Sequence, residues 1–295
     1  TRTKWALNRT PFGPTFKDVC APMTIWTPVP MPPQAPVTEG IAKLPGTRLW
    51  YWDTGGSGPV VVLLHAASGS GAFWGYQQPV LAKAGYRVIG YSRRGYLKSD
   101  PGDPNDPGIG SEDLQNLMAH LGVDRFHVVG LAAGAIIATD YALSHPERLL
   151  SLTLASTIMG VTDKSYVDLC NVFRPPFFAQ LPKDFQELSA TYRAGNPEGA
   201  AAWSALEKTS QIGARLNQKL ANVITWAKVE TIKVPTLLMT GDADLWTPPS
   251  VLRLQASHMP HAETAVIQEA GHAPSWEQPQ AFNRTLLDFL GRHRG

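Results

Sequence analysis

The 295-residue chain has few cysteines, no long hydrophobic run and almost no net charge. No stretch approaches the roughly 18 consecutive apolar residues of a membrane-spanning helix, so we expect no membrane span. The formal charge is +2, and no basic run is longer than Arg93-Arg94. Nucleic acid and anionic membranes are therefore poor candidates for partners. With 43% hydrophobic and 17% charged residues, the composition is that of an ordinary globular protein.

The two cysteines, Cys20 and Cys170, form neither a metal-binding spacing nor a CxxC motif. Two possibilities stay open: two free thiols, or a disulfide that ties the start of the chain to its middle. The sequence also lacks a phosphate-binding loop and a dinucleotide fingerprint, because Gly55-Gly56-Ser57-Gly58 opens no helix. We therefore expect neither a metal nor another cofactor.

Residues 1–45 differ from the rest of the chain. They are rich in proline and show no helical or strand period, which favours an extended arm. The chain starts at Thr1, which fits either a removed signal peptide or a trimmed chain. These features favour an exported protein, periplasmic or secreted, over a cytoplasmic one. The sequence makes no prediction of the oligomeric state.

From Thr47 onward, short apolar runs alternate with amphipathic stretches. Strands are predicted at residues 48–53, 60–64, 87–91, 126–131, 150–155, 236–239 and 263–268. Helices are predicted at residues 73–84, 112–121 (with Ser111 as the N-cap), 133–144, from about 249, and from about 279. This alternation predicts an α/β fold, a mostly parallel sheet with helices on both faces. The core would comprise residues 46–156 and 230–295.

Between residues 157 and 229 the strand signals vanish, and the stretch is helical and aromatic. The aromatic residues are Tyr166, Phe173, Phe177, Phe178, Tyr192, Trp203 and Trp226. An insertion of this size between two strands predicts a helical cap over the C-terminal edge of the sheet. Its aromatic content predicts a mostly apolar pocket for a small to medium hydrophobic substrate.

The segment Gly130-Leu131-Ala132-Ala133-Gly134 lies between a predicted strand and a predicted helix. The nucleophile elbow of serine hydrolases has the motif G-x-S-x-G in that same context. Small residues are needed there because the turn is tight. The glycine frame is intact, and only the central residue differs, since Ala132 stands where the motif has serine.

Two further motifs follow in the order acid, then histidine. Asp242 and Asp244 come directly after the predicted strand 236–239, and His272 follows the strand 263–268. A nucleophile position, an acid and a histidine in this order are typical of α/β-hydrolases and not of chymotrypsin-like or subtilisin-like proteases.

Over residues 47–292 the chain resembles the α/β-hydrolase superfamily. The segment from Leu63 to Ser70 resembles the H-G-x-x-x-S oxyanion loop of that family, with Ala66 where glycine is usual. The segment from Tyr91 to Asp100 resembles its D-x-R-G-x-G-x-S segment, and Gly271-His272 through Glu277-Gln278-Pro279 resembles its histidine loop. Each of these three segments is a weak signal alone, but together with the elbow at residues 130–134 they occur in the order and spacing of the family.

The resemblance implies a role for each of these positions. His272 would be the general base and acid, and Asp244, three positions after its glycine, would orient it in preference to the rival Asp242. The backbone N–H groups of Ala67 and Ala133 would form the oxyanion hole. Trp246 would either line the substrate pocket or simply pack inside the protein.

An alanine cannot attack a carbonyl, so no acyl-enzyme can form through Ala132. One explanation is a serine-to-alanine change in a hydrolase. The other is a protein that only binds a ligand, or one that uses His272 as a base without a nucleophile. The retained Asp244 and His272 favour the first explanation.

We therefore expect a Ser-His-Asp hydrolase of a hydrophobic carboxylic ester or lactone, inactive as written. A hydrolase of carbon–carbon bonds in aromatic catabolism is the alternative. Such enzymes usually carry tryptophan directly after the histidine, where this chain has Ala273.

Overall fold

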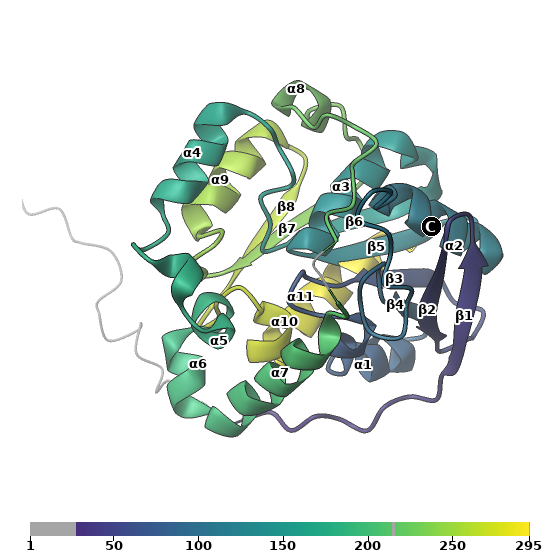
Figure 1. Cartoon of the computed structure of the whole chain (residues 1–295), viewed down its shortest axis with the longest axis horizontal. Coiled ribbons are helices and arrows are strands. Elements are labelled where there is room, and N and C mark those ends of the chain that lie inside the picture. The colour runs from purple at the N-terminus through teal and green to yellow at the C-terminus, as the bar shows by residue number, and fades with distance from the viewer. Residues whose placement is uncertain (1–27, 214–215, 295) are drawn as a thin grey trace, which may run out of the picture.

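The computed structural model describes residues 28–213 and 216–294, and its centre is an eight-stranded sheet (Figure 1). The strands lie in the order β1-β2-β4-β3-β5-β6-β7-β8. Strands β3 to β8 pair in parallel, whereas β1 and β2 pair antiparallel with each other and β2 with β4. The strand bounds are β1 Thr38–Leu44, β2 Thr47–Asp53, β3 Val60–Leu64, β4 Arg87–Tyr91, β5 Phe126–Leu131, β6 Leu149–Ala155, β7 Thr236–Gly241 and β8 Glu263–Ile267.

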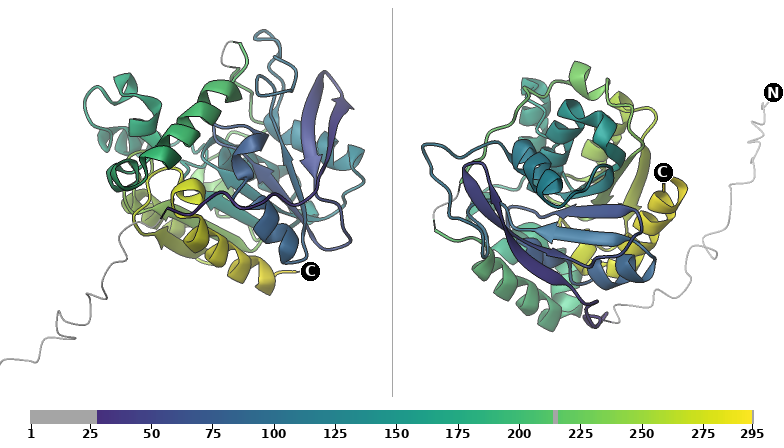
Figure 2. Two further views of the ribbon diagram at one scale, coloured as in Figure 1. Left: turned by 90° about the horizontal axis from the view of Figure 1, so that it is seen from below. Right: turned by 90° about the vertical axis from the view of Figure 1, so that its right-hand side faces the viewer.

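Both faces of the sheet are covered by helices, and these layers can be followed in Figure 2. Consecutive strand residues point to opposite faces. Val62 and Leu64 therefore pack in one apolar cluster with α2 and α3, whereas Val61 and Leu63 pack in another with α11. The helix bounds in the core are α1 Gln78–Lys83, α2 Gly110–His120, α3 Ala133–Ser144, α9 Pro249–His258, α10 Pro274–Glu277 and α11 Pro279–Arg292.

The strand order reverses direction at β3, because the next strand in sequence, β4, lies on one side of it and β5 on the other. In open parallel sheets, ligands bind outside the carboxyl ends of the strands at such a switch point. The loops after β3 and β5 meet there, and they carry Ala67 and Ala132.

Between β6 and β7 the chain leaves the sheet, and we call residues 157–229 the cap segment. It contains α4 Lys164–Val172, a 3-10 turn at Phe178–Gln180, α5 Lys183–Glu187, α6 Ala190–Gly195, α7 Pro197–Ser210 and α8 Trp226–Val229. Helices α4 to α7 gather at one side of the molecule (Figure 1). Its far end returns to the core at α3, where the buried Asp140 accepts hydrogen bonds from the N–H groups of Ala221 and Asn222.

Strand β1 lies inside the segment that was expected to be an arm without strands, so this prediction is wrong for residues 38–44. The strand forms a hairpin with β2 through a turn at Pro45-Gly46, where Gly46 has a φ of +70°. It was missed because β1 is an edge strand, and of its seven side chains only that of Ala42 is fully buried. An edge strand of this kind has little hydrophobic alternation.

Two predicted helix starts also differ. Ser111 is not an N-cap, because α2 starts at Gly110 and the Ser111 hydroxyl instead donates to Asp140 Oδ2 at 2.5 Å. The helix predicted at 73–84 is a 3-10 turn at Gly71–Trp74 followed by the short helix α1. Pro79, in the first turn of α1, has no N–H to extend an earlier helix through that point.

Cys170 is a buried residue of α4, whereas Cys20 lies outside the described residues, so the pairing of the two cysteines stays a prediction. Within residues 28–213 and 216–294, no helix is both long and apolar enough to cross a membrane.

The link at Asp140 yields a stability prediction. Asp140→Asn replaces an accepting oxygen by an NH2 group that faces N–H and O–H donors. We expect the free energy of unfolding in urea to fall by about 2–3 kcal/mol. Asp124→Asn, the same change at an exposed site, should stay within about 0.5 kcal/mol of the starting protein. Equal effects of the two substitutions would contradict this role of Asp140.

Candidate active site

Ala132 sits at the sharp turn between β5 and α3, with φ 50° and ψ −110°. An L-residue other than glycine rarely adopts a positive φ, and holding one there costs about 1–3 kcal/mol. The turn is held by hydrogen bonds on both sides of the residue. The N–H of Ala132 donates to Ala155 O at 2.9 Å, and its carbonyl accepts from Thr157 Oγ1 at 3.0 Å.

The two glycines of the motif are required by close backbone contacts. A Cβ atom on Gly134 would lie 2.2 Å from the carbonyl oxygen of Leu64, at the end of the neighbouring strand. A Cβ atom on Gly130 would lie 2.4 Å from the Cα atom of Ala135. Only glycine fits at either position. Residues 130–134 therefore form the tight strand-to-helix turn that the sequence motif predicted.

The loop after β3 is held by polar side chains beneath it. The Tyr96 hydroxyl donates to the carbonyl of Ala67 at 3.1 Å, and His65 Nδ1 lies 2.7 Å from the carbonyl of Ala66. Because His65 Nε2 accepts from the N–H of Arg93, this ring is neutral with its proton on Nδ1. Burial, with the nearby Arg93 charge, holds the pKa of His65 well below its usual range. The carbonyl groups of Ala66 and Ala67 are thus fixed by hydrogen bonds to buried side chains.

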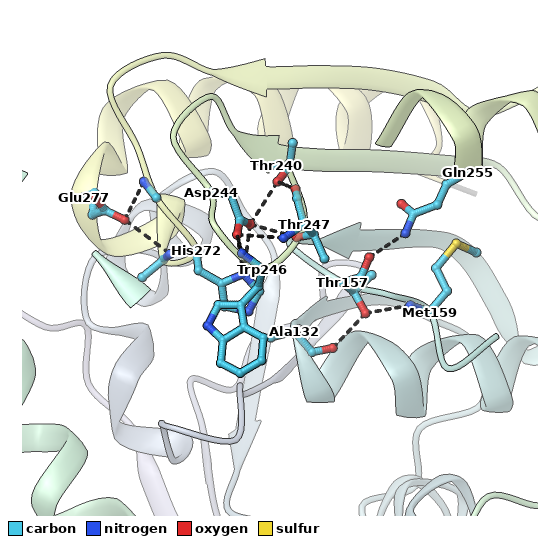
Figure 3. Close-up of polar contacts among 12 residues, drawn as sticks. Ala132, Thr157, Met159, Thr240, Asp244, Trp246, Thr247, Gln255, His272 and Glu277 are labelled. Atoms are coloured by element: carbon cyan, nitrogen blue, oxygen red, sulfur yellow. Dashed lines mark hydrogen bonds and ion pairs between the residues drawn. The ribbon is translucent and has the colours of Figure 1, made fainter. Parts of the chain in front are cut away.

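His272 and Asp244 form a buried pair at the ends of β8 and β7. His272 Nδ1 lies 3.0 Å from Asp244 Oδ1 and 2.9 Å from Oδ2, which leaves Nε2 on the side of the ring away from the carboxylate. Figure 3 shows Asp244 surrounded by donors. They are the hydroxyl groups of Thr240 and Thr247 and the N–H groups of Trp246 and Thr247, at 2.8–3.0 Å. The rival acid Asp242 is exposed and accepts from the N–H of Ala270, so the structure brings Asp244, and not Asp242, to His272.

The pair shifts the pKa of both groups. Burial alone would raise the pKa of Asp244, but the positive charge of His272 and the hydrogen bonds to the carboxylate lower it to about 2. Burial would likewise lower the pKa of His272, yet the charge of Asp244 and their hydrogen bond raise it above its ordinary value. Asp244 is therefore ionised at neutral pH and favours the protonated imidazole, as an orienting acid does.

Glu277 joins the histidine loop to the cap segment. Its carboxylate accepts from the N–H groups of Gly271 at 2.8 Å, Ala273 at 3.3 Å and, across from the cap, Ser189 at 2.7 Å. Burial raises the pKa of Glu277 to about 7 against these hydrogen bonds. In addition, the N–H of His272 donates to the carbonyl of Glu187 at 2.7 Å. The backbone position of His272 therefore depends on the cap.

A cavity of about 260 Å³ brings the expected site residues together. Ala132, His272, Ala67, Ala133 and Trp246 all line it. Ala133 is the first residue of α3, where a helix has no internal partner for the backbone N–H. Trp246 therefore does more than pack inside the protein, because it forms part of the cavity wall.

The cap side of the cavity differs from the expected apolar wall. The cap aromatics do not line it among the described residues; Trp203, for example, packs against Phe73. In their place the cap contributes polar side chains, namely Arg174, Lys183, Glu187, Glu207 and Gln211. The accessible wall of the cavity is mostly apolar, as expected, but the expectation of few polar contacts is wrong. That part failed because aromatic content alone does not reveal which side chains of the cap turn inward.

Sequence reasoning missed several residues of the site. Thr240 and Thr247 flank the acid, and the position of Thr247, three residues after Asp244, is a signal that could have identified it as a hydrogen-bond donor to the carboxylate. Arg174 and Glu187 stand in a segment without any motif. In the part of the chain that the structure describes, no three His, Cys, Asp or Glu side chains are grouped to hold a metal ion.

Comparison with known proteins identifies the family. Residues 59–197 match the family model of the alpha/beta hydrolase fold. The protein RutD of Stutzerimonas stutzeri is 30% identical over 250 residues, covering 80% of this chain and 93% of RutD. The chain belongs to the α/β-hydrolase family. This finding confirms both the resemblance and the predicted fold class.

Two further relatives of this α/β-hydrolase are informative. A 2-hydroxy-6-oxononadienedioate/2-hydroxy-6-oxononatrienedioate hydrolase of Paraburkholderia phymatum is 29% identical over 278 residues, covering 87% of this chain and 94% of the relative. Est816, described as an N-acyl homoserine lactone degrading enzyme, is 26% identical with a TM-score of 0.71, covering 85% of this chain and all of Est816. Together they support a hydrolase function in general terms.

The pair at His272 yields a titration prediction. We expect the imidazole to titrate above 6.5, because Asp244 outweighs the effect of burial. In Asp244→Asn burial becomes the main influence, against the smaller effects of Glu187 and Glu277, so the pKa of His272 should fall below 6.5. NMR titration of the ring protons measures both values, with His272→Gln assigning the signal. Asp242→Asn is the matched control and should leave the pKa unchanged; a shift as large as that of Asp244→Asn would identify the wrong acid.

Proposed function

We propose that this site hydrolyses a carboxylic ester or lactone through a serine at position 132, and that the chain as written, with Ala132, lacks the nucleophile. The observation that carries the proposal is the backbone of Ala132. A turn held at φ 50° is strained, and it presents its side chain to the cavity that His272 also lines. Neither the strain nor the buried His272–Asp244 pair contributes to simple ligand binding.

The proposed reaction follows from the arrangement of these groups. With serine at position 132, its Oγ attacks the carbonyl carbon of the substrate while His272 Nε2 takes the hydroxyl proton. Asp244 keeps Nδ1 protonated and stabilises the imidazolium that forms. His272 then donates the proton to the alcohol oxygen as the ester bond breaks. A water molecule, deprotonated by His272, releases the acid and restores the serine.

The negative charge on the carbonyl oxygen needs donors that are in place beforehand. The proposed donors are the N–H groups of Ala67 and Ala133, which line the same cavity. Tyr96 and His65 hold the loop on its carbonyl side, so the loop need not reorganise during the reaction. One such donor typically contributes about 3–4 kcal/mol to stabilising the transition state.

A carbon–carbon bond hydrolase is the second candidate, because the relative from Paraburkholderia phymatum carries such a name. The two functions share the nucleophile position, the base and the oxyanion donors. They differ in the substrate, so a panel that contains esters, lactones and vinylogous 1,5-diketones separates them. Use of His272 as a base without a nucleophile would instead give activity to the chain as written.

Restoring the nucleophile is the direct test. Ala132→Ser should hydrolyse short 4-nitrophenyl esters or simple lactones at least 1000-fold faster than the chain as written, on the order of what a nucleophile contributes. An organophosphate should inactivate only the serine variant. Ala132→Cys is a second variant that keeps a nucleophile in the same place.

Two outcomes would contradict the proposal. Equal activity of the chain with Ala132 and with serine would place the chemistry at His272 alone. A folded Ala132→Ser variant that is inert on the whole panel and does not react with the organophosphate would favour a binding protein. Ala132→Gly is the matched control without a nucleophile and should remain inactive.

The raised pKa of His272 predicts the pH dependence of the serine variant. A general base must be neutral, so kcat/KM should rise with pH and reach half of its maximum above pH 6.5. Adding Asp244→Asn should lower the maximum by several orders of magnitude and move the midpoint below pH 6.5. A profile that stays flat from pH 5 to 9 would contradict the assignment of His272.

A further inference from the structure

Arg174 extends from the cap segment into the wall of the cavity. Its guanidinium carbon lies 4.5 Å from the centre of the Trp246 ring. The centre of the Trp246 ring in turn lies 5.9 Å from that of the His272 ring, and the ring of Phe178 packs edge-on against Trp246 with 4.8 Å between the ring centres. The guanidinium is therefore fixed one tryptophan ring away from the candidate base.

Two hydrogen-bond donors of this stack have no acceptor. Arg174 Nε and Trp246 Nε1 are both buried, and neither has a hydrogen-bond partner among the described residues. Buried donors in native proteins nearly always have a partner, and leaving one without costs about 1–3 kcal/mol. Two such donors on neighbouring side chains of one cavity wall indicate an acceptor that comes from a ligand.

The charge of Arg174 also lacks a counter-charge. Its only hydrogen bond is from Nη1 to Asn171 Oδ1 at 2.8 Å, and no carboxylate of the described residues lies within ion-pair distance. The two acids of the cavity wall do not compensate for it. Glu187 faces His272 and Lys183, and burial raises the pKa of its carboxyl, which favours the neutral form; Glu207 forms no ion pair with Arg174.

From these observations we propose that Arg174 and Trp246 form an anion subsite, and that the substrate carries a carboxylate in addition to its reacting group. Both N–H groups are covered as the residues stand, so a small shift of the Arg174 side chain on the Trp246 ring would let the carboxylate accept from Arg174 Nε and Trp246 Nε1 while the reacting carbonyl lies at Ala132. A guanidinium stacked on an indole loses little freedom when it binds such a group. The reacting ester or lactone rests on the proposed function, but the anion subsite does not.

The size of the cavity limits the substrate further. A volume of about 260 Å³ accommodates a short molecule rather than a long acyl chain. We therefore expect a short dicarboxylic monoester, or a lactone acid, with a few carbon atoms between its carboxylate and the reacting carbonyl.

Binding to the unaltered chain tests the subsite without any turnover. Monomethyl glutarate carries the carboxylate, and dimethyl glutarate is its neutral counterpart. We expect the monoester to bind about 10-fold or more tightly than the diester, the effect of a charged hydrogen bond. NMR titration measures both affinities, and the indole N–H signal of Trp246, assigned with Trp246→Phe, should shift only with the monoester.

Matched variants locate the effect. Arg174→Met should abolish the preference for the monoester, and Trp246→Phe, which keeps a ring but removes the N–H, should reduce it. Arg253→Met removes the same charge from an exposed position on α9 and should leave the preference intact. Equal affinities for the monoester and the diester would overturn the proposal, as would no binding of either. Equal effects of Arg174→Met and Arg253→Met on the preference would also overturn it.

Kinetics of the serine variant separate this inference from the proposed function. If Ala132→Ser hydrolyses 4-nitrophenyl valerate and mono(4-nitrophenyl) glutarate with equal KM, the function stands and the subsite fails. If the variant is inert while the monoester still binds through Arg174, the subsite stands and the hydrolase function fails.

Discussion

The site depends on one backbone constraint, the turn that reverses the chain between β5 and α3. Here the helix starts so close to the neighbouring strand β3 that the Leu64 carbonyl excludes any side chain at Gly134. The close contact leaves Ala132 with a positive φ and directs its side chain away from the packed layers. Every other group of the site lies around the point where that side chain emerges.

The sheet brings these groups together from distant parts of the sequence. The loops after β3, β5, β7 and β8 all leave the carboxyl edge, and they carry Ala67, the turn at Ala132, Asp244 and His272 respectively. Because the strands are buried on both faces, the positions of these loops are fixed by the two apolar clusters of the core. One side of the cavity is thus positioned by the ends of the buried strands, whereas the opposite side comes from the cap segment.

The sequence was sufficient to predict the core and the residues that meet at the cavity because these have local signatures. Buried parallel strands are nearly continuous apolar runs, and the elbow needs glycine at fixed positions for steric reasons. The strand β1 was missed because its side chains are mostly exposed. Arg174 could not be predicted either, because its place in the cavity depends on how α4 and the following turn fold against Trp246. The spacing of residues in the sequence does not reveal where the helices of a cap lie relative to the sheet.

The hydrogen bonds of Glu277 have a consequence for how a ligand enters. One carboxylate binds both the histidine loop and Ser189, and the next residue but one in the cap, Glu187, accepts from the backbone of His272. If α5 moved outward to admit a ligand, these hydrogen bonds would break and the backbone of His272 would lose part of its support. A ligand that enters without breaking these hydrogen bonds must therefore pass a part of the cavity wall other than residues 187–189.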